Sequence, residues 1–401
     1  MNRVINGMHI ENARIGEGAA DRNAIIGRDG AATLLHLQAA QVYPQIRADL
    51  GPNVLIHVRM YQPNWFVLDP RKWAQDTLAF LRGIPGLLDD PRVLITAANE
   101  PDLAAEGHPG AATVDHPHPT LAVWREIWTW SGLFSLEWRR IAVGTRVKLG
   151  TTPPAGGHEP VGFPPDYEYQ MLEFRQHARD CDAVVVHGYC NRDWTGHSPE
   201  TAGYWAALRC IRPAGWRERD GTLPQGGISD PGGVAVQIPN KPFLMAEFGN
   251  WHHNDAGGPE VEKTLAQFRS VYQHLSATGR CLGATPFIWN SDDDHRENRI
   301  YGNNALVDGL KRMERFPAAE FGASVPSAPQ PSKPLSEQYP KEFAQWLKEG
   351  GLEDNFGRHL RAIRSDIPVS GADVLDAIGG AKAAAEQAAL IAARYKFNSG
   401  G

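Results

Sequence analysis

The sequence predicts an α/β protein folded as a (β/α)8 TIM barrel with a small helical C-terminal extension. Short apolar, β-branched runs alternate with longer segments of helical period, which is typical of repeated βα units around a parallel sheet. Eight such runs occur, and eight βα units that close on themselves make a barrel. A chain of 401 residues, 42% of them hydrophobic, is long enough for one barrel and an appendage.

The expected strands are bounded by turn residues and are rich in valine, isoleucine and leucine. They span about 3–10, 32–37, 53–60, 92–98, 141–149, 182–188, 242–247 and 282–289.

Helices are expected between the strands, near 38–49, 70–83, 120–139, 167–178, 199–211, 259–277 and 303–314. The segment 259–277 shows the reasoning, because Pro259 suits a first helical turn. Its apolar residues then form one stripe made of Leu265, Phe268, Val271, Tyr272 and Leu275. The segment 11–31 is rich in Gly and Ala and has no convincing stripe, so no helix is assigned to it.

Charge and hydropathy exclude several partners. The net charge is −6 and no Lys/Arg block resembles a nucleic-acid stripe, so we expect no nucleic-acid partner. No apolar run approaches the ~20 residues of a membrane span, and the N-terminus has no apolar signal region. We therefore expect a soluble protein without a membrane partner, cytoplasmic or released without a visible signal peptide, and bacterial or phage-like.

The cysteines are expected to be buried free thiols, because no CxxC pair occurs among Cys181, Cys190, Cys210 and Cys281.

Two glutamates end apolar runs at opposite parts of the sequence. Glu100 follows IleThrAlaAlaAsn at 95–99, and Glu247 ends PheLeuMetAla at 243–246. In a βα barrel the active site forms at the carboxyl ends of the strands, so both side chains are expected there. Two carboxylates so placed are the equipment for acid/base cleavage of a glycosidic bond.

Asn99-Glu100-Pro101 follows the fourth expected strand, and Glu247 ends the seventh. His187 and Tyr189 follow the sixth strand, and Trp289 ends the eighth. In these residues the chain resembles the clan A glycoside hydrolases. The resemblance covers roughly residues 1–315. It implies a retaining enzyme for β-glycosidic bonds, with Glu247 as nucleophile and Glu100 as acid/base, about 5–5.5 Å apart.

The resemblance also implies roles for neighbouring side chains. Asn99 would bind the sugar 2-hydroxyl, or else be a turn residue before Pro101. Tyr189 would hold the nucleophile, or be a tyrosine satisfied by backbone. Trp289 would form the floor of the sugar subsite, or belong to the core.

Further substrate-binding candidates come from the loops. Arg59 and Tyr61 follow the third strand, and Trp251 and His252 follow the nucleophile. His187 completes the set.

Histidines at strand positions raise the alternative of a metal-dependent barrel hydrolase. They are His9, His36, His57 and His187. The HisXHis pair expected on the first strand of such enzymes is absent, so interior or subsite histidines, no metal and no cofactor are expected.

The barrel domain is expected over 1–322, a Pro/Ser-rich linker over 323–336 and a helical extension over 337–401. The extension is too small for a robust core of its own, so we expect it to pack on the barrel, self-associate or join a larger assembly.

Two other functions stay open: a non-catalytic carbohydrate-binding barrel, and a phage-type virion or lysis component acting on cell-surface glycans. An oligosaccharide or polysaccharide is the expected substrate, but the sequence does not specify the sugar, the linkage, or endo as against exo action.

Overall fold

The computed structural model describes residues 3–10, 16–34, 41–60, 64–108, 110–113, 119–155, 166–190, 206–215, 230–250, 258–289 and 299–321. The linker and extension expected after residue 322 lie outside this part of the chain and remain predictions.

The described chain contains eight strands, which confirms the expected number. They are β1 (Gly7–Ile10), β2 (Ala31–Leu34), β3 (Leu55–Arg59), β4 (Val93–Thr96), β5 (Lys148–Leu149), β6 (Val184–Cys190), β7 (Phe243–Asn250) and β8 (Cys281–Pro286).

The strands pair in chain order and in parallel. β1 to β5 form one sheet and β6 to β8 a second. Parallel bridges from Gly150 to Ala183 and from Asn6 to Ala284 join the two sheets at both edges. The sheet is therefore closed, and the fold is the predicted (β/α)8 barrel.

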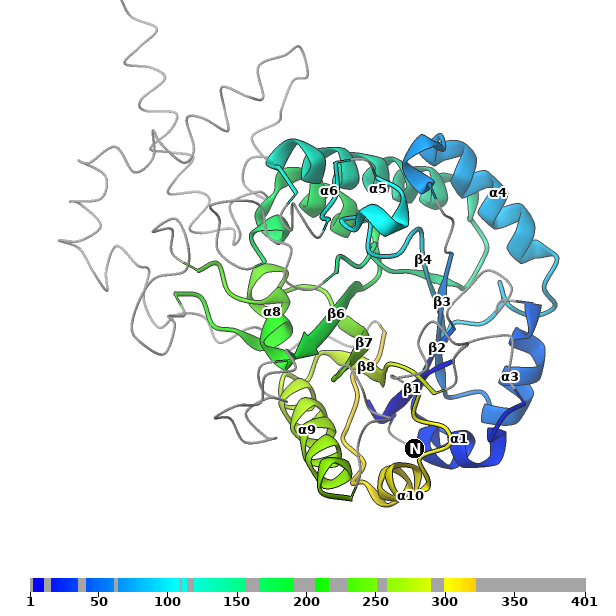
Figure 1. Ribbon diagram of the computed structural model, residues 1–401. Helices are drawn as coiled ribbons and strands as arrows, with labels where there is room; N and C mark the ends of the chain where they lie inside the picture. Colours follow the sequence, from blue (N-terminus) through cyan, green and yellow to red (C-terminus); the bar gives the residue numbers. More distant parts are fainter. Residues whose placement is uncertain are drawn as a thin grey trace, which may run out of the picture. The chain divides into compact units, whose positions relative to one another are not determined.

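Helices surround the strands, as Figure 1 shows. The α-helices are α1 (Ala19–Ile26), α3 (Tyr43–Leu50), α4 (Pro70–Arg82), α5 (Leu121–Ile141), α6 (Leu172–Asp180), α8 (Val234–Gln237), α9 (Gly258–Ala277) and α10 (Asn304–Arg312). Three 3-10 turns are η1 (Trp65–Val67), η2 (Ala104–Glu106) and η3 (Tyr167–Gln170). Of the helix expected over 199–211, residues 206–211 are described and are helical.

Two expectations about these elements were wrong. The strand expected over 141–149 is only Lys148–Leu149, because α5 continues to Ile141 and a turn follows it. The segment 11–31 does contain a helix, α1, which buries Ile25 and Ile26 although its apolar stripe is too weak to be recognised in the sequence.

The interior of the barrel is apolar in one layer and polar in the next. Leu55, Leu94, Leu244 and Leu282 belong to a compact cluster separate from the main core. Because side chains alternate along a strand, His57 lies on the same face of β3 as Leu55. The next layer along the strands is therefore polar, and it leads toward the carboxyl ends.

Threonine hydroxyl groups provide hydrogen-bond partners for the polar atoms of this buried layer. His57 Nδ1 lies 3.3 Å from Thr33 Oγ1, and its Nε2 lies 3.2 Å from Thr96 Oγ1. Thr33 Oγ1 in turn lies 2.9 Å from Thr285 Oγ1. Burial lowers the pKa of His57 well below its usual value, so this imidazole is neutral at neutral pH. It is one of the satisfied interior histidines that the sequence predicted.

A bulge in β7 turns Glu247 toward the interior. Val186 pairs with Met245, but the next residue of β6, His187, pairs with Glu247, so Ala246 is an extra residue. Both Leu244 and Ala246 belong to the interior cluster. Without the extra residue, strict alternation would direct Glu247 outward, whereas the bulge places it beside His187.

The helix predictions from residue patterns hold where they were most specific. In α9, the expected stripe of Leu265, Phe268, Val271, Tyr272 and Leu275 is buried.

None of the described helices is long and apolar enough to cross a membrane. Cys181, Cys210 and Cys281 are buried free thiols, as predicted.

Candidate active site

Glu247 lies at the centre of the site, on β7. Its side chain is only 4% exposed and pairs with the guanidinium of Arg59, which projects from the end of β3. Tyr189 Oη donates a 2.5 Å hydrogen bond to the other carboxylate oxygen, Oε2. Three strands thus converge on one carboxylate.

The surroundings of Glu247 favour its ionised form. Burial alone would raise the pKa of this carboxyl, but the nearby His187 and Arg59 and a hydrogen bond from His9 outweigh it. The pKa of Glu247 is therefore held well below its usual value. A buried carboxylate that stays ionised at neutral pH can act as a nucleophile.

The hydroxyl of Tyr189 keeps its proton in this environment. Burial, and then the negative charges of Glu247 and Glu100, raise the pKa of Tyr189 well above its usual value. The phenol is therefore a permanent donor to Glu247. The sequence predicted this contact for Tyr189.

His9, on β1, contacts the same carboxylate from another direction. Its Nε2 lies 3.4 Å from Glu247 Oε1 and 3.2 Å from Arg59 Nη1. Burial lowers the pKa of His9 to about 4, so the ring is neutral at neutral pH. Arg59 is then the permanent cation among the described groups in contact with Glu247.

Glu100 follows β4 and approaches from the other side of His187. Its Oε1 lies 2.8 Å from His187 Nδ1, and its side chain is 15% exposed. The backbone of Glu100 has a φ of 35°, in the left-handed region that non-glycine residues rarely occupy. Its amide donates to the carbonyl oxygen of Pro153 at 3.0 Å. The residue is therefore held in a strained conformation by its neighbours.

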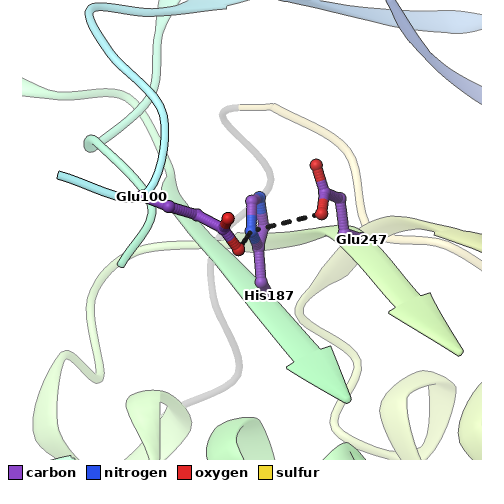
Figure 2. Close-up of side chains that lie close together, drawn as sticks. All are labelled: Glu100, His187 and Glu247. Atoms are coloured by element: carbon purple, nitrogen blue, oxygen red, sulfur yellow. Dashed lines mark hydrogen bonds and ion pairs between the residues drawn. The ribbon is translucent and has the colours of Figure 1, made fainter. Parts of the chain in front are cut away.

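His187 lies between the two glutamates. Figure 2 shows its imidazole between the two carboxylates. Its Nδ1 is 3.5 Å from Glu247 Oε2 in addition to its contact with Glu100. The three side chains each bring one ligand-type atom within 4.8 Å of the others, so a carboxylate oxygen of Glu100 lies within 4.8 Å of one of Glu247.

The same three atoms are close enough to ligate one cation. Arg59 and Tyr189 already donate to the two oxygens of Glu247, so a metal would compete with a guanidinium and a phenol for the same carboxylate. These side chains therefore suit acid/base and nucleophilic chemistry by the carboxylates themselves better than metal binding.

Asn99 is buried next to Glu100. It is 3% exposed, and its Nδ2 donates to Oε1 of Glu106 at 3.1 Å. Glu106 lies on η2, in the loop after β4. Sequence reasoning did not identify Glu106, because an isolated glutamate in a loop carries no signal of its own.

The loop after β5 is fixed by a buried arginine. Arg209 Nη1 donates to the carbonyl oxygen of Ala155 at 2.7 Å, and more weakly to those of Pro154 and His187. Its guanidinium also pairs with Asp166 and Glu168. Because the carbonyl of Pro153 accepts from the amide of Glu100, this arginine supports the backbone around Glu100.

Trp289 is fully buried in the structure. Its indole Nε1 donates to the carbonyl oxygen of Glu17 at 2.9 Å, and its ring packs against Tyr301. With no exposed face for a sugar, its position favours the core alternative over the predicted subsite floor.

The structure thus brings together Glu100, Glu247, Asn99, His187, Tyr189 and Arg59 of the predicted residues. Tyr61, Trp251 and His252 lie outside the described residues. His9 was noticed in the sequence only as one of several strand histidines, and Arg209 was missed because its role depends on loops that meet only in the folded chain.

Comparisons with known proteins give structural neighbours only. No protein-family model matches the chain, and no curated protein matches it. Among solved structures, it is similar to a GH128 (subgroup II) endo-beta-1,3-glucanase from Sorangium cellulosum. The two are 12% identical, with 78% of this chain and 99% of the other covered and a TM-score of 0.44.

A beta-mannanase from Thermomonospora fusca is similar at 11% identity, covering 74% of this chain and 82% of the other, with a TM-score of 0.40. The barrel assignment rests on the strand pairing of the chain itself.

Proposed function

We propose that this protein is a retaining glycoside hydrolase that cleaves β-glycosidic bonds of an oligosaccharide or polysaccharide. Glu247 is the nucleophile and Glu100 the general acid/base. The observation that carries the proposal is the approach of the two carboxylates to within 4.8 Å, with one of them held ionised in a buried site.

The spacing supports retention of configuration. Retaining enzymes hold their carboxyl groups about 5–5.5 Å apart, whereas inverting enzymes need roughly 6.5–9.5 Å to admit a water molecule between the base and the sugar. The closest oxygen atoms of Glu100 and Glu247 lie within 4.8 Å of each other, which supports the retaining spacing.

In the first step, a Glu247 oxygen forms a bond to the anomeric carbon while the bond to the leaving oxygen breaks. Glu100 gives its proton to that oxygen and becomes a carboxylate. In the second step, Glu100 takes a proton from water, whose oxygen displaces Glu247 from the anomeric carbon. The proton that Glu100 gives in the first step is thus restored to it in the second, and Glu247 is released as a carboxylate.

His187 contacts both carboxylates through Nδ1 and helps to hold them in position. Arg59 and Tyr189 orient Glu247 and stabilise its charge as it leaves the sugar in the second step. Asn99 has a second Nδ2 hydrogen besides the one given to Glu106, and this hydrogen is suited to bind the sugar 2-hydroxyl.

The test begins with aryl β-glycosides and β-linked glucans and mannans, comparing the wild type with Glu100→Ala and Glu247→Ala. Azide is then added to each variant. We expect a glycosyl azide of retained configuration from Glu100→Ala and one of inverted configuration from Glu247→Ala, because azide replaces water in one case and the nucleophile in the other. If either variant cleaves substrate as fast as the wild type, the two-glutamate mechanism is wrong.

A further inference from the structure

The contact between Asn99 and Glu106 leaves two buried oxygen atoms without a donor. Asn99 Nδ2 donates to Glu106 Oε1, but Asn99 Oδ1 and Glu106 Oε2 have no hydrogen-bond partner among the described residues. Both atoms are acceptors if Glu106 is ionised. A buried acceptor without a donor loses its hydrogen bonds to water and gains none in return, so two together need an explanation.

One proton on Glu106 supplies the missing donor. A carboxylic acid has one acceptor oxygen and one O–H, and a primary amide has the complementary N–H and carbonyl oxygen. A protonated Glu106 can therefore accept from Asn99 Nδ2 and donate to Asn99 Oδ1. An ionised Glu106 can only accept.

The charged groups around Glu106 come from several elements of the barrel. The pKa of Glu106 is raised to about 7. Burial raises it most, the hydrogen bond from Asn99 and the charge of Arg59 lower it, and the charges of Glu100 and Glu247 raise it. His108, two residues further along, lies 3.2 Å from Glu126 and has its own carboxylate partner.

The backbone that carries Glu106 is firmly held. The amide of Ala104 donates to the carbonyl of Ala112, whose own amide donates to the carbonyl of Asp102 at 2.7 Å. Gly107 follows with a φ of 107°, and a Cβ at this position would lie 2.6 Å from the Cα of Asn64. Only glycine fits this close approach, which fixes the turn that places Glu106 beside Asn99.

We propose that Glu106 is a positioning residue which, as a neutral carboxylic acid, holds the amide of Asn99 through both its oxygen and its nitrogen. The second Nδ2 hydrogen of Asn99 is then fixed in direction, and ionisation of Glu106 releases the amide. The use of that hydrogen for a sugar hydroxyl rests on the proposed function, whereas the pairing of the two side chains does not.

The pairing is tested by NMR on protein labelled with ¹⁵N-asparagine, with the Asn99 side-chain signals assigned from an Asn99→Asp variant. We expect these signals to titrate with a midpoint near pH 7 in the wild type. They should still titrate in Glu100→Gln, with a midpoint no higher than in the wild type because the charge of Glu100 raises the pKa of Glu106. They should not titrate in Glu106→Gln, whose amide carries a permanent donor. Glu126→Gln, an exposed glutamate in the following helix, is the matched control and should leave the titration unchanged. Asn99 signals that do not titrate in the wild type, or that titrate equally in Glu106→Gln, overturn the proposal.

Kinetics on a cleaved β-glycoside and its 2-deoxy analogue test the consequence for substrate. Glu106→Ala should lower kcat/KM for the parent glycoside by about tenfold to 100-fold, because a loosened binding group misplaces the sugar. It should affect the 2-deoxy analogue much less, and Glu106→Gln should recover most of the loss. Equal losses for both substrates, or no recovery in Glu106→Gln, contradict the positioning role. If the wild type cleaves no glycoside, the proposed function fails while the NMR titration still decides the pairing.

Discussion

The hydroxyl of Tyr189 donates a 2.5 Å hydrogen bond to Oε2 of Glu247. His187, two residues earlier on β6, lies 3.5 Å from the same oxygen. Residues at i and i+2 of a strand share a face, so β6 delivers an imidazole and a phenol to one carboxylate oxygen. Substituting either the imidazole or the phenol should therefore change the pKa of Glu247 while the other group keeps its contact.

Tyr189→Phe removes the phenol donor and should raise the pKa of Glu247, because a hydrogen bond to the charged form favours it. A nucleophile with a higher pKa is ionised only at higher pH, so the acid limb of the kcat/KM profile should move upward. We expect a loss of about 100-fold to 1000-fold at neutral pH, comparable to removing one preorganised donor at a charge-bearing oxygen. An acid limb that stays in place would show that this hydrogen bond does not control the nucleophile.

Arg59→Met removes the buried cation paired with Glu247. Both side chains are about 5% exposed or less, so the remaining carboxylate would be buried and uncompensated. Breaking such a pair costs roughly 3–5 kcal/mol. We expect a clear drop in Tm at pH 7.

The pH dependence of that drop follows from the direction of the Glu247 shift. Because its pKa in the folded protein lies below the usual 4.5, its stabilisation is present above that value and is lost as pH falls. The difference in Tm between wild type and Arg59→Met should therefore be largest at pH 6 to 8 and shrink below about pH 4.5. Adding Glu247→Gln should recover part of the loss, and a pH-independent difference would contradict this account.

The stability of Glu106→Gln relative to wild type should change with pH in the direction opposite to that of Arg59→Met. The pKa of Glu106 is raised to about 7, so its contribution is fully present below the unfolded value of 4.5 and is lost as pH rises through 7. Glutamine does not ionise, so the Tm of the variant relative to wild type should increase between pH 5 and pH 8. Thermal unfolding at the two pH values measures this difference. A constant difference would indicate that Glu106 does not titrate in this range.

The barrel and the two glutamates were predictable because each leaves a local signal. Buried parallel strands read as continuous apolar runs, and a carboxylate at the end of such a run is conspicuous in the sequence. The strand expected over 141–149 was wrong because Ile141 and Val143 are apolar but belong to a helix end and the turn after it. Local hydrophobicity does not separate these states.

The supporting contacts were not predictable in the same way. The contact of His9 with Glu247 requires closure of β1 against β8, and the inward direction of Glu247 requires the extra residue at Ala246 in β7. A strand bulge leaves no mark in the spacing of a single strand, because it exists only relative to the neighbouring strand. Glu106 and Arg209 become recognisable only once their loops are placed.

Arg209→Lys should loosen the backbone around Glu100. The guanidinium of Arg209 reaches two carbonyl oxygens of the loop after β5 and two carboxylates at once, which a single ammonium group cannot do. We expect a lower Tm together with a lower kcat, and a smaller change in KM. Arg139→Lys is the control, because Arg139 lies on α5 with a side chain that is 49% exposed. Equal effects from both substitutions would rule out a specific role for Arg209.

The Glu100→Ala variant should be less stable than the Glu100→Gly variant. Its φ of 35° lies where a Cβ costs about 1–2 kcal/mol and glycine costs nothing. Both Glu100→Ala and Glu100→Gly should abolish acid/base catalysis, but we expect Glu100→Gly to have the higher free energy of unfolding in urea. At Lys72, an exposed position in the first turn of α4, the order should reverse, because glycine is less favourable than alanine in a helix, by up to about 1 kcal/mol, and both variants lose the contact with Asp76 equally. If alanine is the more stable residue at both positions, Glu100 does not hold a strained backbone, and its placement beside His187 has a cause other than the turn after β4.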